Sequence, residues 1–148
     1  REQAAAVLYN YLAEGAAGYD SSGMPDVSDD WYTEAVNWAV ANGIMNGYDS
    51  GEFGVGDALT REQFCAIIAN AVGADLEGID ESALGAFPDA GGASEWARRA
   101  VAWAVESGVI HGAELEDGSR ALQAGRAISR SEMAAMMMNA EASGVLGR

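Results

Sequence analysis

The fold is decided by residues 35–47, AVNWAVANGIMNG, which return 65 positions later as residues 100–112, AVAWAVESGVIHG. In both copies large and small apolar residues recur at spacings of three and four, which is typical of one buried face of an α-helix. Gly43 and Gly108 hold the same place in each copy, where a helix commonly ends in a left-handed residue. A segment that returns in fixed order predicts a repeat protein, whose function lies in features that the copies share.

Downstream of each copy a second helix is predicted to begin at a capping box. The boxes are Thr60 to Gln63 and Ser129 to Glu132, in which the side chain of each end residue bonds to the backbone N–H of the other. A partial third copy opens the chain, because residues 1–3 (REQ) repeat as residues 61–63. Upstream, the first helices are expected to have N-caps at Ser28 or Asp29 in one copy and at Ser94 in the other.

Each repeat is therefore predicted to fold as helix, glycine-rich loop and helix, with at most short strands in the loops. We expect an all-α, mainly helical chain that forms one domain over residues 1–148. It would hold the tail of a truncated motif at 1–14, a complete motif at 24–73 and a complete, divergent motif at 87–142. Because residue 1 falls inside a repeat, an uncovered apolar face is expected to favour self-association of this truncated chain.

Composition excludes several classes of function. The net charge of −15 argues against nucleic acid and anionic membrane surfaces as partners, and no apolar stretch is long enough for membrane insertion. The single Cys65 lies in an apolar helical run and is expected to be buried. His111 has no metal-ligand spacing to another side chain, and no nucleophile or phosphate-loop motif is present, so we predict no metal, cofactor or catalytic residue.

Three arginines carry the main functional signal. Arg1, Arg61 and Arg130 align in the first turn of the second helix of each copy, where a cation opposes the helix dipole at a cost of about 0.3–1 kcal/mol. Each arginine could, together with free backbone N–H groups, hold a carboxylate of a ligand. Alternatively, each could pair with an acid of another motif, such as Asp26 or Asp89. The two interpretations are compatible with each other.

Four tryptophans divide into two pairs. Trp31 and Trp96 precede the two first helices and could offer an aromatic face to a ligand, although tryptophans on an apolar stripe usually belong to the core. Trp38 and Trp103 lie one or two turns further along and are expected to pack inside.

The motifs, in their order, resemble those of the S-layer homology family. The first complete copy contains Pro-Asp-Val at 25–27, tryptophan at 31, Ala-Val-x-Trp at 35–38, Gly-Tyr-x-x-Gly-x-Phe at 47–53 and Leu-Thr-Arg at 59–61. The second copy keeps the Pro-Asp pair, the tryptophan, the helix and the arginine. Its loop between residues 112 and 128 departs from the family pattern altogether.

This resemblance implies a pseudo-threefold spindle of three motifs that anchors an exported protein to the bacterial cell wall without a covalent bond. The implied partner is an acidic, often pyruvylated, secondary cell-wall polysaccharide bound in grooves between motifs, so the implied location is extracellular, at the bacterial cell surface. The implied ligand-binding residues are the three motif arginines with the two leading tryptophans: Arg1, Arg61, Arg130, Trp31 and Trp96.

Two other functions stay open. Degenerate repeats could form a structural protein–protein assembly domain, and carboxylates that only the fold brings together could serve an enzyme. The arginines separate the first alternative from an anchor, because an anchor needs an accessible arginine with spare donors. An assembly domain would bury the same arginines in ion pairs.

Overall fold

The computed structural model describes residues 1–13, 18–19, 21–114, 116–117 and 120–146. The chain divides into two compact units, Arg1–Ala58 and Leu59–Arg148. The described residues are mainly helical, and strands are limited to one short antiparallel pair, which confirms the predicted fold class. The predicted single domain and spindle remain predictions, and residue 14 of the predicted motif tail lies outside the described residues.

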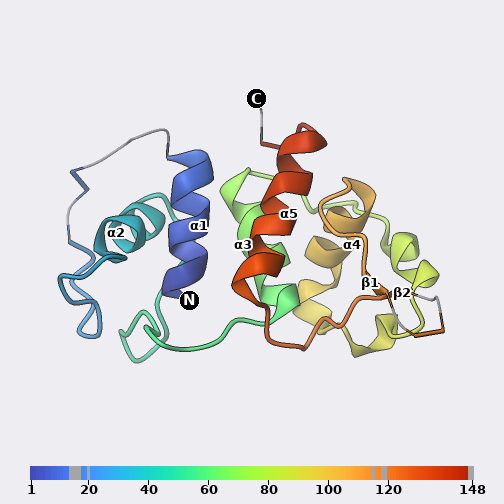
Figure 1. Ribbon diagram of the computed structural model, residues 1–148, viewed down its shortest axis with the longest axis horizontal. Helices are drawn as coiled ribbons and strands as arrows, with labels where there is room; N and C mark the ends of the chain where they lie inside the picture. The colour runs from blue at the N-terminus through green and yellow to red at the C-terminus, as the bar shows by residue number, and fades with distance from the viewer. Residues whose placement is uncertain (14–17, 20, 115, 118–119, 147–148) are drawn as a thin grey trace. The chain divides into compact units, whose positions relative to one another are not determined.

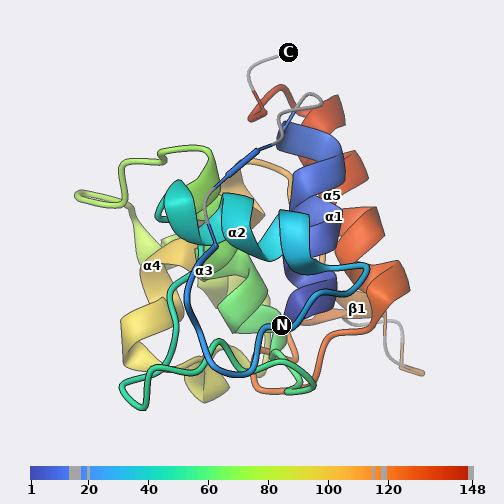
Figure 2. The same cartoon turned by 90° about the vertical axis from the view of Figure 1, so that its left-hand side faces the viewer.

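The first unit is built on two crossing helices, α1 (Glu2–Leu12) and α2 (Thr33–Ala41) (Figures 1 and 2). Their contact buries small and branched apolar side chains beside the ring of Trp38, which is buried as expected. The Tyr9 ring meets the Trp38 ring edge to face, with centroids 5.7 Å apart. Residues 42–58 then form the loop that carries the Gly-Tyr-x-x-Gly-x-Phe motif.

The second unit holds three α-helices, labelled in Figure 1: α3 (Arg61–Ala71), α4 (Arg98–Glu106) and α5 (Arg130–Ala142). Helix α4 packs against α3 and against the 3₁₀ helix η1 (Glu81–Ala86). Two further 3₁₀ turns, η2 (Ala90–Gly92) and η3 (Glu95–Ala97), lead into α4. Strands β1 (Ala113–Glu114) and β2 (Arg120–Ala121) form the short hairpin that was expected in the loop.

Both units pair the same two parts of the repeat. An arginine-led helix, α1 or α3, packs on the first helix of the following copy, α2 or α4. Consequently, the boundary between units lies just before α3, inside the first complete sequence motif. This pairing places Arg1 and Arg61 each beside the loop of the next copy.

The helix ends explain which predictions succeed. Both capping boxes form at Thr60 and Ser129, and Gly43 and Gly108 adopt φ of 68° and 82°, as expected. The predicted N-caps of the first helices are wrong, because α2 begins after Tyr32 and α4 after Ala97, without a side-chain cap. In each case the chain first makes a tight turn, which delays the helix by several residues.

The tight turn also decides where two tryptophans lie. Trp31 and Trp96 sit on it, before the regular helix, and are 60% and 63% exposed. They therefore do not lie on the buried helix face on which their spacing would place them. The predicted burial of Cys65 is confirmed, with 1% of the residue exposed. In the described part of the chain, no helix is long and apolar enough to cross a membrane.

Candidate functional site

In the first unit Arg1 lies in a socket made by the loop of the following copy. Its Nε donates a hydrogen bond to the Phe53 carbonyl at 2.6 Å, and its Nη2 donates to the Asn46 carbonyl at 2.5 Å. The guanidinium carbon stands 4.7 Å from the Tyr48 ring centroid and 5.2 Å from the Phe53 ring centroid. Such faces attract a cation without neutralising it. Among the ion pairs of the described residues, none reaches this guanidinium.

Asp26 of the Pro-Asp motif fixes the loop that forms the socket. Its carboxylate accepts hydrogen bonds from the backbone N–H groups of Phe53, Gly54 and Val55 at 2.7, 2.7 and 2.9 Å. Desolvation opposes ionisation of Asp26, but the three donors together outweigh it and lower its pKa. Asp26 is therefore occupied with shaping the loop and is not the partner of an arginine.

Gly54 is required at the floor of this socket. Its φ is 96°, and a Cβ at this position would lie 2.7 Å from Arg1 Cδ and 2.8 Å from the Tyr48 ring. The rim of the socket is exposed, since Tyr48 is 44% accessible. Its hydroxyl donates to Asp57 Oδ2 at 2.8 Å, and partial burial, reinforced by this hydrogen bond, raises the Tyr48 pKa.

The second unit repeats the main backbone contacts of this socket. Arg61 Nε donates to the Leu122 carbonyl at 2.9 Å, as Arg1 Nε does to Phe53 in the first unit. The Asp89 carboxylate accepts from the N–H groups of Leu122 and Gln123, each at 2.9 Å. Gln123, with a φ of 52°, takes the place that a glycine holds in the first unit. The two arginine sites are thus equivalent in backbone architecture.

The neighbours of the two arginines differ. Arg61 is only 6% exposed, and its Nη1 forms an ion pair with Glu132, the acid of the α5 capping box. The same carboxylate holds Arg126 and accepts from the Ser129 N–H. Although desolvation acts in the opposite direction, the hydrogen bonds from Arg126 and Ser129, with the charge of Arg61, lower the Glu132 pKa to about 2. An ion pair with an acid of another motif is therefore present here, made by Glu132 and not by Asp89.

The remaining predicted site residues lie apart from these sockets. Arg130 is exposed at the first residue of α5, and no ion pair joins it to the described residues. Trp31 contacts the ring of Tyr32, with centroids 5.5 Å apart, and no described contact joins it to Arg1. His111 is exposed, and no group of three potential metal ligands is found among the residues that the structure describes.

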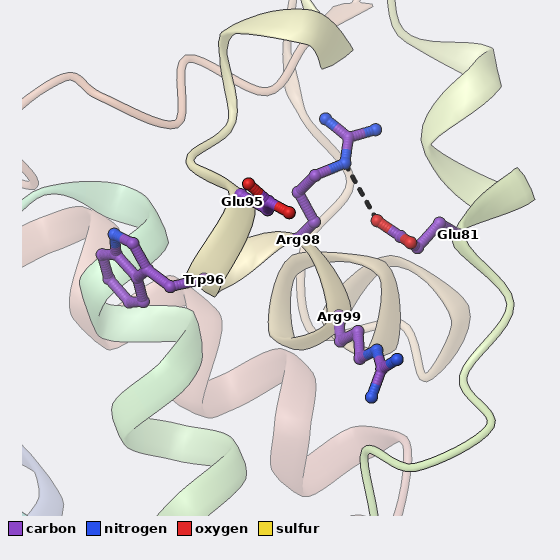
Figure 3. A pocket seen from close by; sticks show the side chains of 5 residues that line it. All are labelled: Glu81, Glu95, Trp96, Arg98 and Arg99. Atoms are coloured by element: carbon purple, nitrogen blue, oxygen red, sulfur yellow. Dashed lines mark hydrogen bonds and ion pairs between the residues drawn. The ribbon is translucent and has the colours of Figure 1, made fainter.

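Trp96 lines a pocket that the sequence did not reveal. The pocket has a volume of about 600 Å³, and its other lining residues are Glu81, Glu95, Arg98 and Arg99 (Figure 3). Arg98 Nε donates to Glu81 Oε1, and its Nη1 donates to the Ala90 carbonyl, both at 2.9 Å. One sequence signal could have indicated this pocket, since residues 98–99 are the only two consecutive basic residues in the chain.

Comparison with known proteins agrees with these motifs. The family model of the S-layer homology domain matches residues 24–65 and 86–134, more than half of the chain. The Surface-layer 125 kDa protein of Lysinibacillus sphaericus is 34% identical over 134 residues, which are 90% of this chain and 11% of that protein. An Amylopullulanase of Thermoanaerobacterium thermosulfurigenes is 37% identical over 87 residues, 57% of this chain and 5% of that protein.

The chain thus spans only about a tenth, or less, of the length of these relatives. No solved structure matches it significantly. The two segments that the family model matches each contain a Pro-Asp pair, an exposed tryptophan and the capping box at which a helix begins. The chain belongs to the S-layer homology domain family, a family of non-catalytic anchoring domains at the cell surface.

Proposed function

We propose that this chain anchors the protein that carries it to the cell wall by binding an acidic secondary cell-wall polysaccharide. The proposed ligand is a glycan that bears carboxylates, of which a pyruvylated sugar is one form. The Arg1 socket carries the proposal, because it fixes a cation that no described ion pair neutralises, beside an exposed ring of Tyr48, in a chain of net charge −15. Cell-surface anchoring itself follows from the family.

The socket suits a carboxylate for three reasons. Two carbonyls fix the orientation of the guanidinium, so little rotational freedom is lost on binding. No described ion pair reaches its guanidinium, and the flanking rings of Tyr48 and Phe53 attract the charge without neutralising it. Exposed Tyr48 adds an aromatic face against which the apolar side of a sugar ring can pack.

The three motif arginines are expected to contribute unequally. Arg61 is buried and already neutralised by Glu132, so a ligand carboxylate would have to displace an internal one. Arg130 is exposed and lacks an ion pair within the described chain, so it remains a candidate for ligand contact. Self-association of the chain also remains a prediction.

A structural assembly domain is the second candidate, and the buried Arg61–Glu132 pair is the observation that favours it. In that case the arginine sites would stabilise the fold and would not contact a ligand. Anchoring requires that the chain bind the wall polysaccharide, whereas an assembly domain does not. One binding experiment can therefore separate the two functions.

The test is cosedimentation of the full-length protein with purified cell walls, before and after chemical removal of the polysaccharide. Replacing Arg1 with alanine should weaken binding about 10- to 100-fold, the usual effect of losing a hydrogen bond to a charged group. Arg1→Lys should recover only part of the affinity, because an ammonium lacks the planar fork. Arg120→Ala, which removes an exposed arginine outside both sockets, is the matched control.

Equal binding to walls with and without polysaccharide would contradict the proposal. So would an Arg1→Ala protein that binds like the wild type. Thermal melting of each variant shows whether a loss of binding only reflects unfolding.

A further inference from the structure

Two Asn-Gly pairs follow helix α2 along the chain (Figure 1). Asparagine before glycine is prone to spontaneous deamidation, because glycine lets the next backbone nitrogen approach the side-chain amide. One pair is Asn42 with Gly43, at the end of α2, and the other is Asn46 with Gly47, in the loop of the Arg1 socket. Both asparagines are exposed, so accessibility does not distinguish them.

Hydrogen bonds hold the first pair in place. Asn42 Nδ2 donates to the Trp38 carbonyl at 2.8 Å, and the Gly43 N–H donates to the Val40 carbonyl at 3.1 Å. Deamidation would have to join these same two groups. The end of the helix therefore protects Asn42, because both bonds must break before the Gly43 nitrogen can attack.

The second pair has no such protection. Within the described chain, neither the Asn46 side-chain amide nor the Gly47 N–H has a hydrogen-bond partner. Both residues lie outside the helices and the hairpin. A Cβ on residue 47 would lie 2.9 Å from the Glu52 carbonyl oxygen and 2.9 Å from Met24 Cε. The fold thus requires the glycine that makes Asn46 labile.

The hydrogen bond from Arg1 favours the reaction at Asn46. Its Nη2 donates at 2.5 Å to the Asn46 carbonyl, which shares a peptide bond with the Gly47 nitrogen. That nitrogen attacks after it loses its proton, and resonance spreads the resulting negative charge onto the same carbonyl oxygen. The guanidinium stabilises this charge, as a donor in an oxyanion hole does. It also polarises the carbonyl carbon for a later attack by water.

We propose that Asn46 deamidates spontaneously and that its isoaspartyl product closes the Arg1 socket. The Gly47 nitrogen bonds to Cγ of Asn46, and the Cγ–Nδ2 bond breaks. Ammonia leaves with the proton of the Gly47 nitrogen, and a cyclic imide remains. Water then cleaves the imide at one of its two carbonyl carbons. Cleavage at Cγ gives aspartate, whereas cleavage at the α-carbonyl carbon routes the main chain through Cγ and frees the former α-carbonyl as a carboxylate.

This carboxylate forms at the group that Arg1 already holds. The isoaspartyl product therefore neutralises Arg1 with an internal anion, as Glu132 neutralises Arg61 in the second unit. The second copy has serine and histidine, Ser107 and His111, at the positions of the two asparagines, so this reaction is confined to the first unit. The effect of the modification on glycan binding rests on the proposed function, but the modification itself does not.

The test is to age the full-length protein in mildly alkaline buffer and to locate deamidation by peptide mass spectrometry with fragmentation. In the folded protein Asn46 should deamidate about tenfold faster than Asn42, since the bonds that protect Asn42 contribute about 1 kcal/mol each. In urea the two rates should converge. Arg1→Ala should slow the reaction at Asn46 about 10- to 100-fold, the usual effect of one hydrogen bond to a charged group, and Arg120→Ala should leave it unchanged. A loosened fold would instead accelerate Asn42.

Equal rates at the two asparagines in the folded protein would overturn the site. An unchanged rate at Asn46 in Arg1→Ala would overturn the role of Arg1. Labelling with an isoaspartyl methyltransferase identifies the product, and a product that is mainly aspartate would overturn closure of the socket.

Cell-wall binding tests the consequence for the ligand. Aged wild type should bind about 10- to 100-fold more weakly than fresh protein, whereas aged Asn46→Gln should keep its affinity, because a longer side chain does not form the same imide. Undiminished binding by fully deamidated wild type would also overturn closure. If fresh protein does not bind walls at all, the proposed function fails, and the deamidation rates still decide whether Asn46 is the site.

Discussion

Replacing Arg61 with alanine is expected to destabilise the second unit. The change removes the hydrogen bond from Nε to the Leu122 carbonyl and the ion pair with Glu132. A buried acceptor left without its donor costs about 1–3 kcal/mol. Breaking a buried ion pair costs about 3–5 kcal/mol, but Glu132 keeps Arg126 as a partner and its side chain is 24% exposed. We therefore expect a total loss of about 2–4 kcal/mol in the free energy of unfolding.

Urea unfolding followed by tryptophan fluorescence measures this loss. Arg130→Ala is the matched control, since it removes an exposed arginine from the equivalent first position of α5. Its free energy of unfolding should stay within about 0.5 kcal/mol of the wild type. If Arg61→Ala unfolds like Arg130→Ala but loses wall binding, Arg61 is a ligand residue and the structural interpretation of its ion pair is refuted.

Two further predictions concern titratable groups. The pKa of Glu132 is lowered to about 2 from a usual 4.5, so its stabilising contribution is complete above pH 4.5 and is lost as the pH falls toward 2. After allowance for solvent screening, thermal unfolding across this window should show a loss of about 1–3 kcal/mol in the free energy of unfolding. The Glu132→Gln variant should show little of this acid-dependent loss. A wild type as insensitive to acid as this variant would contradict the assignment. Burial raises the pKa of the Cys65 thiol to about 12, so a thiol reagent should label it only when urea opens the unit. Rapid labelling without urea would mean that the buried face of α3 is misassigned.

Local chemistry made several features predictable from the sequence. The capping boxes at Thr60 and Ser129 need only residues three positions apart, and the left-handed Gly43 and Gly108 need only the end of their own helix. The burial of Cys65 follows from the apolar run around it. In each case the partners that fix the conformation are near neighbours in the chain.

The features that the sequence left open depend on distant partners or on a break in the helical spacing. Arg61 and Glu132 are separated by 71 residues, and only the packed unit joins them. Trp96 matches the helical spacing of the buried stripe, but the tight turn before α4 breaks that spacing and leaves it exposed. A prediction of burial from residue spacing assumes a regular α-helix, so it fails where the chain forms a tighter 3₁₀ turn.

The two capping boxes, both in the second unit, differ in charge. Gln63 closes one box with its amide oxygen, which accepts from the Thr60 N–H at 2.8 Å. Glu132 closes the other with a carboxylate, which accepts from the Ser129 N–H at 3.0 Å. For the helix end the two residues are nearly interchangeable, but only the carboxylate brings a charge, and in the second unit that charge neutralises Arg61.

Around Arg1 in the first unit, by contrast, two aromatic rings flank the guanidinium, and none of the described ion pairs reaches it. An arginine at a repeated position is therefore not by itself the mark of a binding site in this chain. The groups that surround its guanidinium decide whether it can hold a ligand.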